Sequence, residues 1–104
     1  MGNSHISLRR LYNFYNRKYF DGELPKDIEI IWHPCDDNNG RSDNLKGKIP
    51  RIWIDPSIQA QPKFVRIVML HECLHIKNPR MNHGKVFKQE IKRLFEAGAY
   101  DGLL

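Results

Sequence analysis

The sequence has no long apolar run, and this absence bears first on the class of protein. None of its hydrophobic stretches approaches the roughly 18 residues that a membrane-spanning helix requires. The N-terminal segment MGNSHISLRR is polar and lacks the apolar core of a signal peptide. Position 6 is Ile where an N-myristoylation motif has Ser or Thr, which argues against a lipid on Gly2. We therefore expect a cytoplasmic protein with no membrane partner.

Cysteine is scarce as well. The chain has two cysteines, Cys35 and Cys73, which do not form a CxxC pair. Without an export signal both are predicted to be reduced, Cys73 as a packing residue on a helix and Cys35 as a loop thiol. Repeats, linkers and low-complexity tracts are also absent. This favours one compact domain over residues 1–104.

Composition and charge are those of a folded domain. The chain has 104 residues, of which 40% are hydrophobic and 28% charged, close to ordinary globular usage. Its small size is compatible with a monomer, and a bound metal would add stability. The net charge is +5, carried by scattered basic residues. Two interpretations stay open, a solvated surface or nucleic-acid contact through Lys46, Lys48 and Arg51 near Trp53.

Three segments have apolar residues at helical spacing. Residues 4–20 form the first, with Ser4 or Ser7 available as an N-cap. Residues 64–77 are apolar around most of the circumference, which predicts a buried central helix with Pro62 in its first turn. Residues 83–97 form the last helix, with Gly98 as its predicted C-cap.

Strand signals fill the interval between the first two helices. Residues 28–32 are short, apolar and β-branched, and residues 41–45 hold a weaker signal. In residues 51–55 side chains of different kinds alternate, which places Ile52 and Ile54 on one face of a strand and Trp53 on the other. This is the pattern of a half-buried edge strand. The order predicts an α+β domain with an N-terminal helix, a short three-stranded sheet, a central helix and a C-terminal helix.

The central helix contains the sequence HECLH. Residues four apart lie on one helix face, so His71 and His75 can direct both imidazoles at one divalent metal ion. Glu72 lies beside the first ligand and can hydrogen-bond a water molecule held there. This is the arrangement by which HExxH sites place a general base. The motif predicts a zinc site with Glu72 as the catalytic residue.

A tetrahedral zinc ion needs a third protein ligand and keeps its fourth position open in a catalytic site. His83 is the predicted third ligand, because the chain can leave the central helix at Pro79 and return at the start of the next helix. Glu90 and Glu96 are the alternatives. His5 and His33 are predicted to be surface histidines.

Tyr100 lies in the C-terminal segment AYDGLL, and we predict a packing role for it in preference to oxyanion stabilisation. The same segment raises one alternative hypothesis, a latent peptidase whose tail covers its own cleft.

Another alternative is a zinc-stabilised nucleic-acid-binding module without turnover. A closed site with four protein ligands would favour that module, and an open metal position would favour an enzyme.

Several stretches resemble the SprT-like family of zinc metallopeptidases, within the HExxH zincins. They are LYNFYNRKYFDGELPKDIEIIW from Leu11, RIWIDPS from Arg51, VMLHECLH, and HGKVF from His83. The short interval between His75 and His83 is similar to that of YgjP-like metallopeptidases, and the small size is similar to that of minigluzincins.

This resemblance implies a small zincin-like domain that binds one Zn²⁺ ion through His71, His75 and His83, with Glu72 as the base. It also implies hydrolysis of peptide bonds in protein or peptide substrates, including DNA-associated proteins. We place an extended substrate along residues 51–55, with Trp53 near the cleft.

Overall fold

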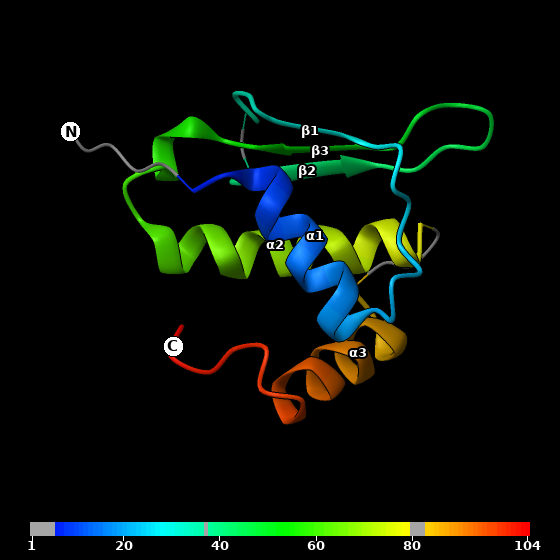
Figure 1. Cartoon of the computed structure of the whole chain (residues 1–104), viewed down its shortest axis with the longest axis vertical. Helices are drawn as coiled ribbons and strands as arrows, with labels where there is room; N and C mark the ends of the chain where they lie inside the picture. Colours follow the sequence, from blue (N-terminus) through cyan, green and yellow to red (C-terminus); the bar gives the residue numbers. More distant parts are fainter. Residues whose placement is uncertain (1–5, 37, 80–82) are drawn as a thin grey trace.

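A computed structural model describes residues 6–36, 38–79 and 83–104 of the chain. It confirms the α+β class, with three helices and a three-stranded mixed sheet (Figure 1). No helix in these ranges is both long and apolar enough to span a membrane. His5, predicted to be a surface histidine, lies outside the described residues.

The first helix, α1 (Leu8–Tyr19), begins at Ser7, one of the two predicted N-caps, whose side chain accepts a hydrogen bond from the backbone of Arg10. Its buried face includes Asn16, which bonds Leu24 twice, donating to the carbonyl at 3.2 Å and accepting from the amide at 2.9 Å. A buried amide thus holds the turn after α1 against the helix.

The sheet has the order β1 (Glu29–Trp32), β3 (Arg51–Ile54), β2 (Gly40–Asp43). Strand β1 pairs with β3 in parallel, and β2 pairs with β3 antiparallel. The prediction of an edge strand at residues 51–55 is therefore wrong, because β3 is the central strand. Alternating burial arises in any strand with one covered face, so it does not reveal whether both edges are paired.

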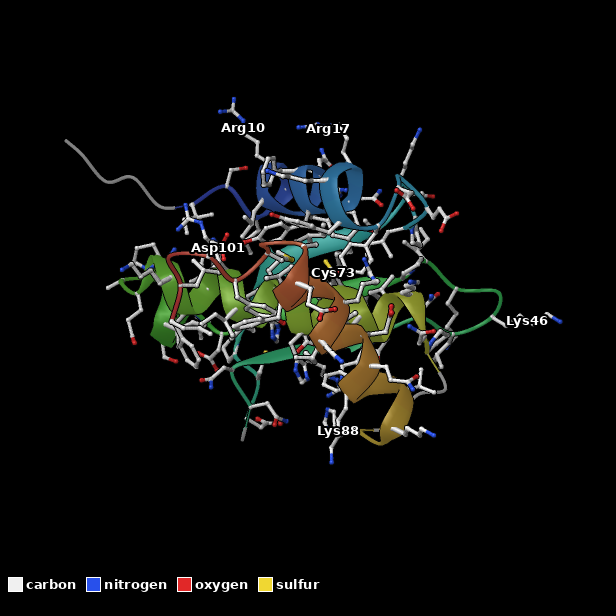
Figure 2. All side chains as sticks on the ribbon, turned by 90° about the horizontal axis from the view of Figure 1, so that it is seen from below. Arg10, Arg17, Lys46, Cys73, Lys88 and Asp101 are labelled. Carbon is white, nitrogen blue, oxygen red and sulfur yellow. The ribbon has the colours of Figure 1, made fainter. Side chains whose placement is uncertain are left out.

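Helix α2 (Pro62–Lys77) covers the inner face of the sheet, where Ile52 and Ile54 are fully buried (Figure 1). Apolar residues on most sides of α2 are buried, because α1 packs against it as well. Cys73 is fully buried, as its predicted packing role requires, and Figure 2 shows it in the interior. Both cysteines are free.

Helix α3 (Lys85–Glu96) begins two residues later than predicted, because Gly84 is its N-cap and His83 precedes it. Glu90 accepts hydrogen bonds from Lys77 at 2.8 Å and from Arg93 at 3.1 Å. Arg93 also donates to the carbonyl of Tyr19 at 2.8 Å. These contacts tie α3 to the end of α2 and to the end of α1.

After α3 the chain turns at Gly98, whose φ of 88° lies in the left-handed region that favours glycine. Tyr100 follows and is buried in the core, 6.2 Å from the ring of Phe95. The packing role predicted for Tyr100 is confirmed. Leu103 packs against the same core, so the C-terminal segment folds back onto the domain.

Candidate metal centre

Three imidazoles converge at the C-terminal half of α2. The Nε2 atom of His75 lies 3.1 Å from those of both His71 and His83, and the third pair is 3.4 Å apart. His71 and His75 come from successive turns of α2, and His83 comes from the segment before α3. The three residues form a group that could hold one metal ion. The structure thus brings together the three residues predicted as ligands.

The ring of Phe87 supports all three histidines. Its centroid lies 5.1 Å from that of His71, 5.3 Å from that of His75 and 4.8 Å from that of His83. Phe87 is buried on α3, so the docking of this helix places His83 and also limits the movement of the two α2 rings. Helical spacing predicted the helix that carries Phe87, but the contacts of this ring with the three histidines were not predictable.

The electrostatics of the cluster favour the neutral form of the two imidazoles on α2. Burial, then the neighbouring His75 and His83, lower the pKa of His71 to about 4. Burial and then His83 lower the pKa of His75. Ring nitrogens must be deprotonated to bind a metal, and these shifts favour that form at neutral pH.

The carboxyl group of Glu72 is bonded to the sheet and does not belong to the group of three ligand histidines. Glu72 is only 5% exposed, and its Oε1 accepts a 2.7 Å hydrogen bond from the hydroxyl of Ser42 on β2. Burial raises the pKa of this carboxyl, and the bond from Ser42 opposes part of the shift. Glu72 also lines the same cavity as the three histidines, so its carboxyl group can act on a molecule bound there.

That cavity has a volume of about 350 Å³ and lies between α2 and β2. Gly40, Ser42 and Leu45 line it from β2 and the loop that follows, and Pro79 lines it from the segment after α2. Asn44 also lines the cavity and donates a 2.7 Å hydrogen bond to the carbonyl of Ile76. The cavity is therefore lined by β2, whose partner among the described strands is β3.

Gly40 allows β2 to approach α2 closely. A Cβ atom at this position would lie 2.6 Å from Cγ1 of Val68 and 3.0 Å from Oε2 of Glu72. Sequence reasoning missed both Gly40 and Ser42, because it treated this region as a polar loop with a weak strand. The available signal was two small residues at alternate positions, which in a strand share one face.

Replacing Gly40 with alanine is expected to push β2 away from α2 and to disturb the bond between Ser42 and Glu72. Overpacking of this kind costs about 1–3 kcal/mol, which urea denaturation would measure. Arg41→Ala, one residue away on the exposed face, is the control and should change stability by no more than about 0.5 kcal/mol. Equal stability of Gly40→Ala and wild type would contradict the close approach.

The alternative ligands do not join the cluster. Glu90 is engaged by Lys77 and Arg93, and Glu96 is exposed. Neither belongs to the group of His71, His75 and His83. Tyr100 does not line the cavity.

Replacing Glu90 with glutamine should leave metal binding intact while loosening α3. Loss of the ion pairs to Lys77 and Arg93 is expected to lower the free energy of unfolding by about 1 kcal/mol. Urea denaturation and metal analysis of the same preparation would test both parts. Glu96→Gln, on the same helix, is the control. A Glu90→Gln protein that bound no metal would make Glu90 a ligand.

Trp53 lies on the outer face of the sheet, so its predicted position near the cleft is wrong. It stacks on His33 with centroids 4.1 Å apart and donates a 3.0 Å hydrogen bond to Glu29. It does not line the metal cavity, because its neighbours Ile52 and Ile54 face α2. His33 is exposed, which confirms its prediction as a surface residue.

Basic side chains are spread over several faces of the molecule. Beside Trp53, Arg51 forms an ion pair with Asp43, so opposite charges partly cancel on the outer sheet face. Figure 2 shows Arg10 and Arg17 pointing outward from α1, and Lys46 extending from the loop between β2 and β3. Nucleic-acid contact through Lys46, Lys48 and Arg51 stays a prediction.

No protein-family model and no curated protein matches this chain. The chemistry of the site is therefore inferred from its own side chains. Three imidazoles can bind one cation, and a buried carboxyl group lines the cavity beside them. Such a site can combine metal binding with proton transfer.

Proposed function

We propose that this chain is a zinc-dependent metallopeptidase of the HExxH type, related to the SprT-like family. The observation that carries the proposal is the separation of the three imidazole nitrogens, 3.1 to 3.4 Å. A tetrahedral zinc ion with zinc–nitrogen bonds of about 2.0–2.1 Å sets its ligand atoms about 3.3–3.4 Å apart. The donor set of His71, His75 and His83 therefore fits zinc.

The number of ligands supports an enzyme. Structural zinc sites take four protein ligands, whereas catalytic sites take three and keep one position open. Within the described ranges the group contains three histidines and no cysteine or carboxylate. The adjoining cavity of about 350 Å³ has room for water and a substrate. These features favour the peptidase over a zinc-stabilised nucleic-acid-binding module.

Bound zinc would supply Lewis acidity and lower the pKa of a coordinated water molecule to about 7. Glu72 is the general base that accepts the proton of the attacking water. Ser42 holds Oε1, which leaves the other carboxylate oxygen to receive that proton. Glu72 then transfers the proton to the nitrogen of the leaving amine. The raised pKa of the buried carboxyl group suits it to both steps, because an effective general base has a pKa near the working pH.

An extended peptide would bind along β2. This strand lines the metal cavity and pairs with β3 on one side, and its other edge pairs with no described strand. Main-chain hydrogen bonds to an open strand edge are a common way to hold a peptide. The central strand β3 has no free edge, so β2 replaces residues 51–55 as the proposed substrate strand.

The proposal is tested on the metal-free chain titrated with Zn²⁺ in the presence of quenched fluorescent peptides. We expect one ion bound per chain and hydrolysis that appears with zinc and disappears with a chelator. Mass spectrometry of the products would identify the cleaved bonds. Zinc binding without cleavage of any peptide in a random library would contradict the peptidase, and no zinc binding would contradict the site itself.

A further inference from the structure

Three neighbouring cavities follow α2 from the histidines toward its N-terminal end. The metal cavity shares Gly40, His71 and Glu72 with a second cavity of about 250 Å³. The second cavity shares Phe64 and Ile67 with a third, of about 600 Å³. The three cavities therefore follow one another along α2, from the histidines to its first turn.

The cavity farthest from the histidines has apolar side chains in its walls. Phe64 and Ile67 line it from α2, and Leu103 lines it from the C-terminal segment. Figure 1 shows the C-terminus on the same side of the molecule as the start of α2. We refer to Phe64, Ile67 and Leu103 as the apolar groove. None of the three is fully buried, so each retains surface that a ligand can cover.

The directions of β2 and α2 determine which part of a peptide reaches the apolar groove. The start of β2 at Gly40 adjoins Val68, and Asn44, just after its end, bonds Ile76, so the two elements run in the same direction. We take the substrate to pair antiparallel to β2, as β3 does on the other edge, and its C-terminal part then lies toward the start of β2. That end is the one where Phe64 and Ile67 lie.

The distance along α2 limits the position further. Ile67 lies one turn before His71, an axial rise of about 6 Å. Two residues of an extended peptide span about 6.6 Å. A side chain within two residues of the cleaved bond can therefore reach the groove.

Building on the proposed function, we infer that the apolar groove is a specificity site for a bulky apolar side chain at the first or second position after the cleaved bond. Leu, Ile, Met and Phe side chains fit this chemistry, because each gains by leaving water against Phe64, Ile67 and Leu103. The C-terminal segment thereby contributes a substrate contact through Leu103.

The test uses the zinc-loaded full chain and peptides that differ at those two positions. For wild type, kcat/KM should be about tenfold to a hundredfold higher with Leu or Phe than with Ser or Asp. Binding of the same peptides to zinc-loaded Glu72→Gln, followed by fluorescence anisotropy, provides a readout that does not require hydrolysis. It should show the same order of preference.

Ile67→Lys should remove the preference in both assays, and Ile67→Leu should retain it. Ile31→Lys is the matched control, because Ile31 is an exposed residue of β1 on no wall of the three cavities. The wild-type peptide series still tests the specificity site if Ile67→Lys does not fold.

The possible failures separate the two proposals. Cleavage without apolar preference, or with a preference that Ile67→Lys leaves unchanged, overturns the specificity site and leaves the peptidase standing. Selective binding without cleavage retains the groove and contradicts the peptidase. Absence of both binding and cleavage overturns the groove. A preference confined to positions before the cleaved bond also overturns it, and so does a dimer in solution whose contact covers Ile67.

Discussion

Glu72→Gln is expected to bind zinc as wild type does and to lose about 10²- to 10⁴-fold in kcat/KM for peptide hydrolysis. General base catalysis contributes a factor of this size, and an amide cannot accept the proton. Glutamine has nearly the same shape as glutamate and keeps an oxygen for the bond from Ser42. The variant should therefore be as stable as wild type or more so, because a buried carboxylate is replaced by a neutral group.

Three measurements on one preparation make this prediction decisive: zinc content, Tm and the rate of hydrolysis. Glu96→Gln is the control, since it changes an exposed glutamate on α3 in the same way. Full activity of Glu72→Gln would remove Glu72 as the base. A loss of zinc together with activity would instead indicate that the carboxyl group takes part in metal binding.

His83→Ala is expected to weaken zinc binding by more than about 100-fold. Loss of an outer-shell partner alone typically costs 10- to 100-fold, and loss of a direct ligand costs more. The remaining His71 and His75 would still face one another across one turn of α2. Because ligand binding stabilises the folded state by mass action, the rise in Tm on adding zinc should largely disappear.

Isothermal titration calorimetry with Zn²⁺ and thermal unfolding with and without the metal would measure both effects. His33→Ala is the matched control, because His33 stacks on Trp53 on the outer face of the sheet. His33→Ala should bind zinc with the affinity of wild type. If His83→Ala bound zinc equally well, the third ligand would have to be another residue.

The predictions that the structure confirms were based on the spacing of apolar side chains along the sequence. Helical spacing indicated α1, α2 and α3 within a few residues of their bounds, and Pro62 marked the start of α2. Strand β1 was also close to its predicted limits. These features depend on side-chain spacing and on proline, which act within a few residues along the chain.

The position of β3 was not predictable in the same way. Burial alternates along Arg51–Ile54, and that pattern reports only which side chains face the core. Pairing with β1 and β2 is made by backbone groups, which every non-proline residue carries. The central place of this strand, and with it the choice of β2 as the open edge, required the three-dimensional structure.

The sequence by itself determined that His71 and His75 share one face of a helix, because four residues make about one helical turn. Only the tertiary structure decided that His83 completes the group, since the docking of α3 through Phe87 and Glu90 places it there. Tertiary packing likewise placed Ser42 against Glu72, 30 positions away. Contacts between residues so far apart depend on how whole elements pack, and no local pattern encodes that.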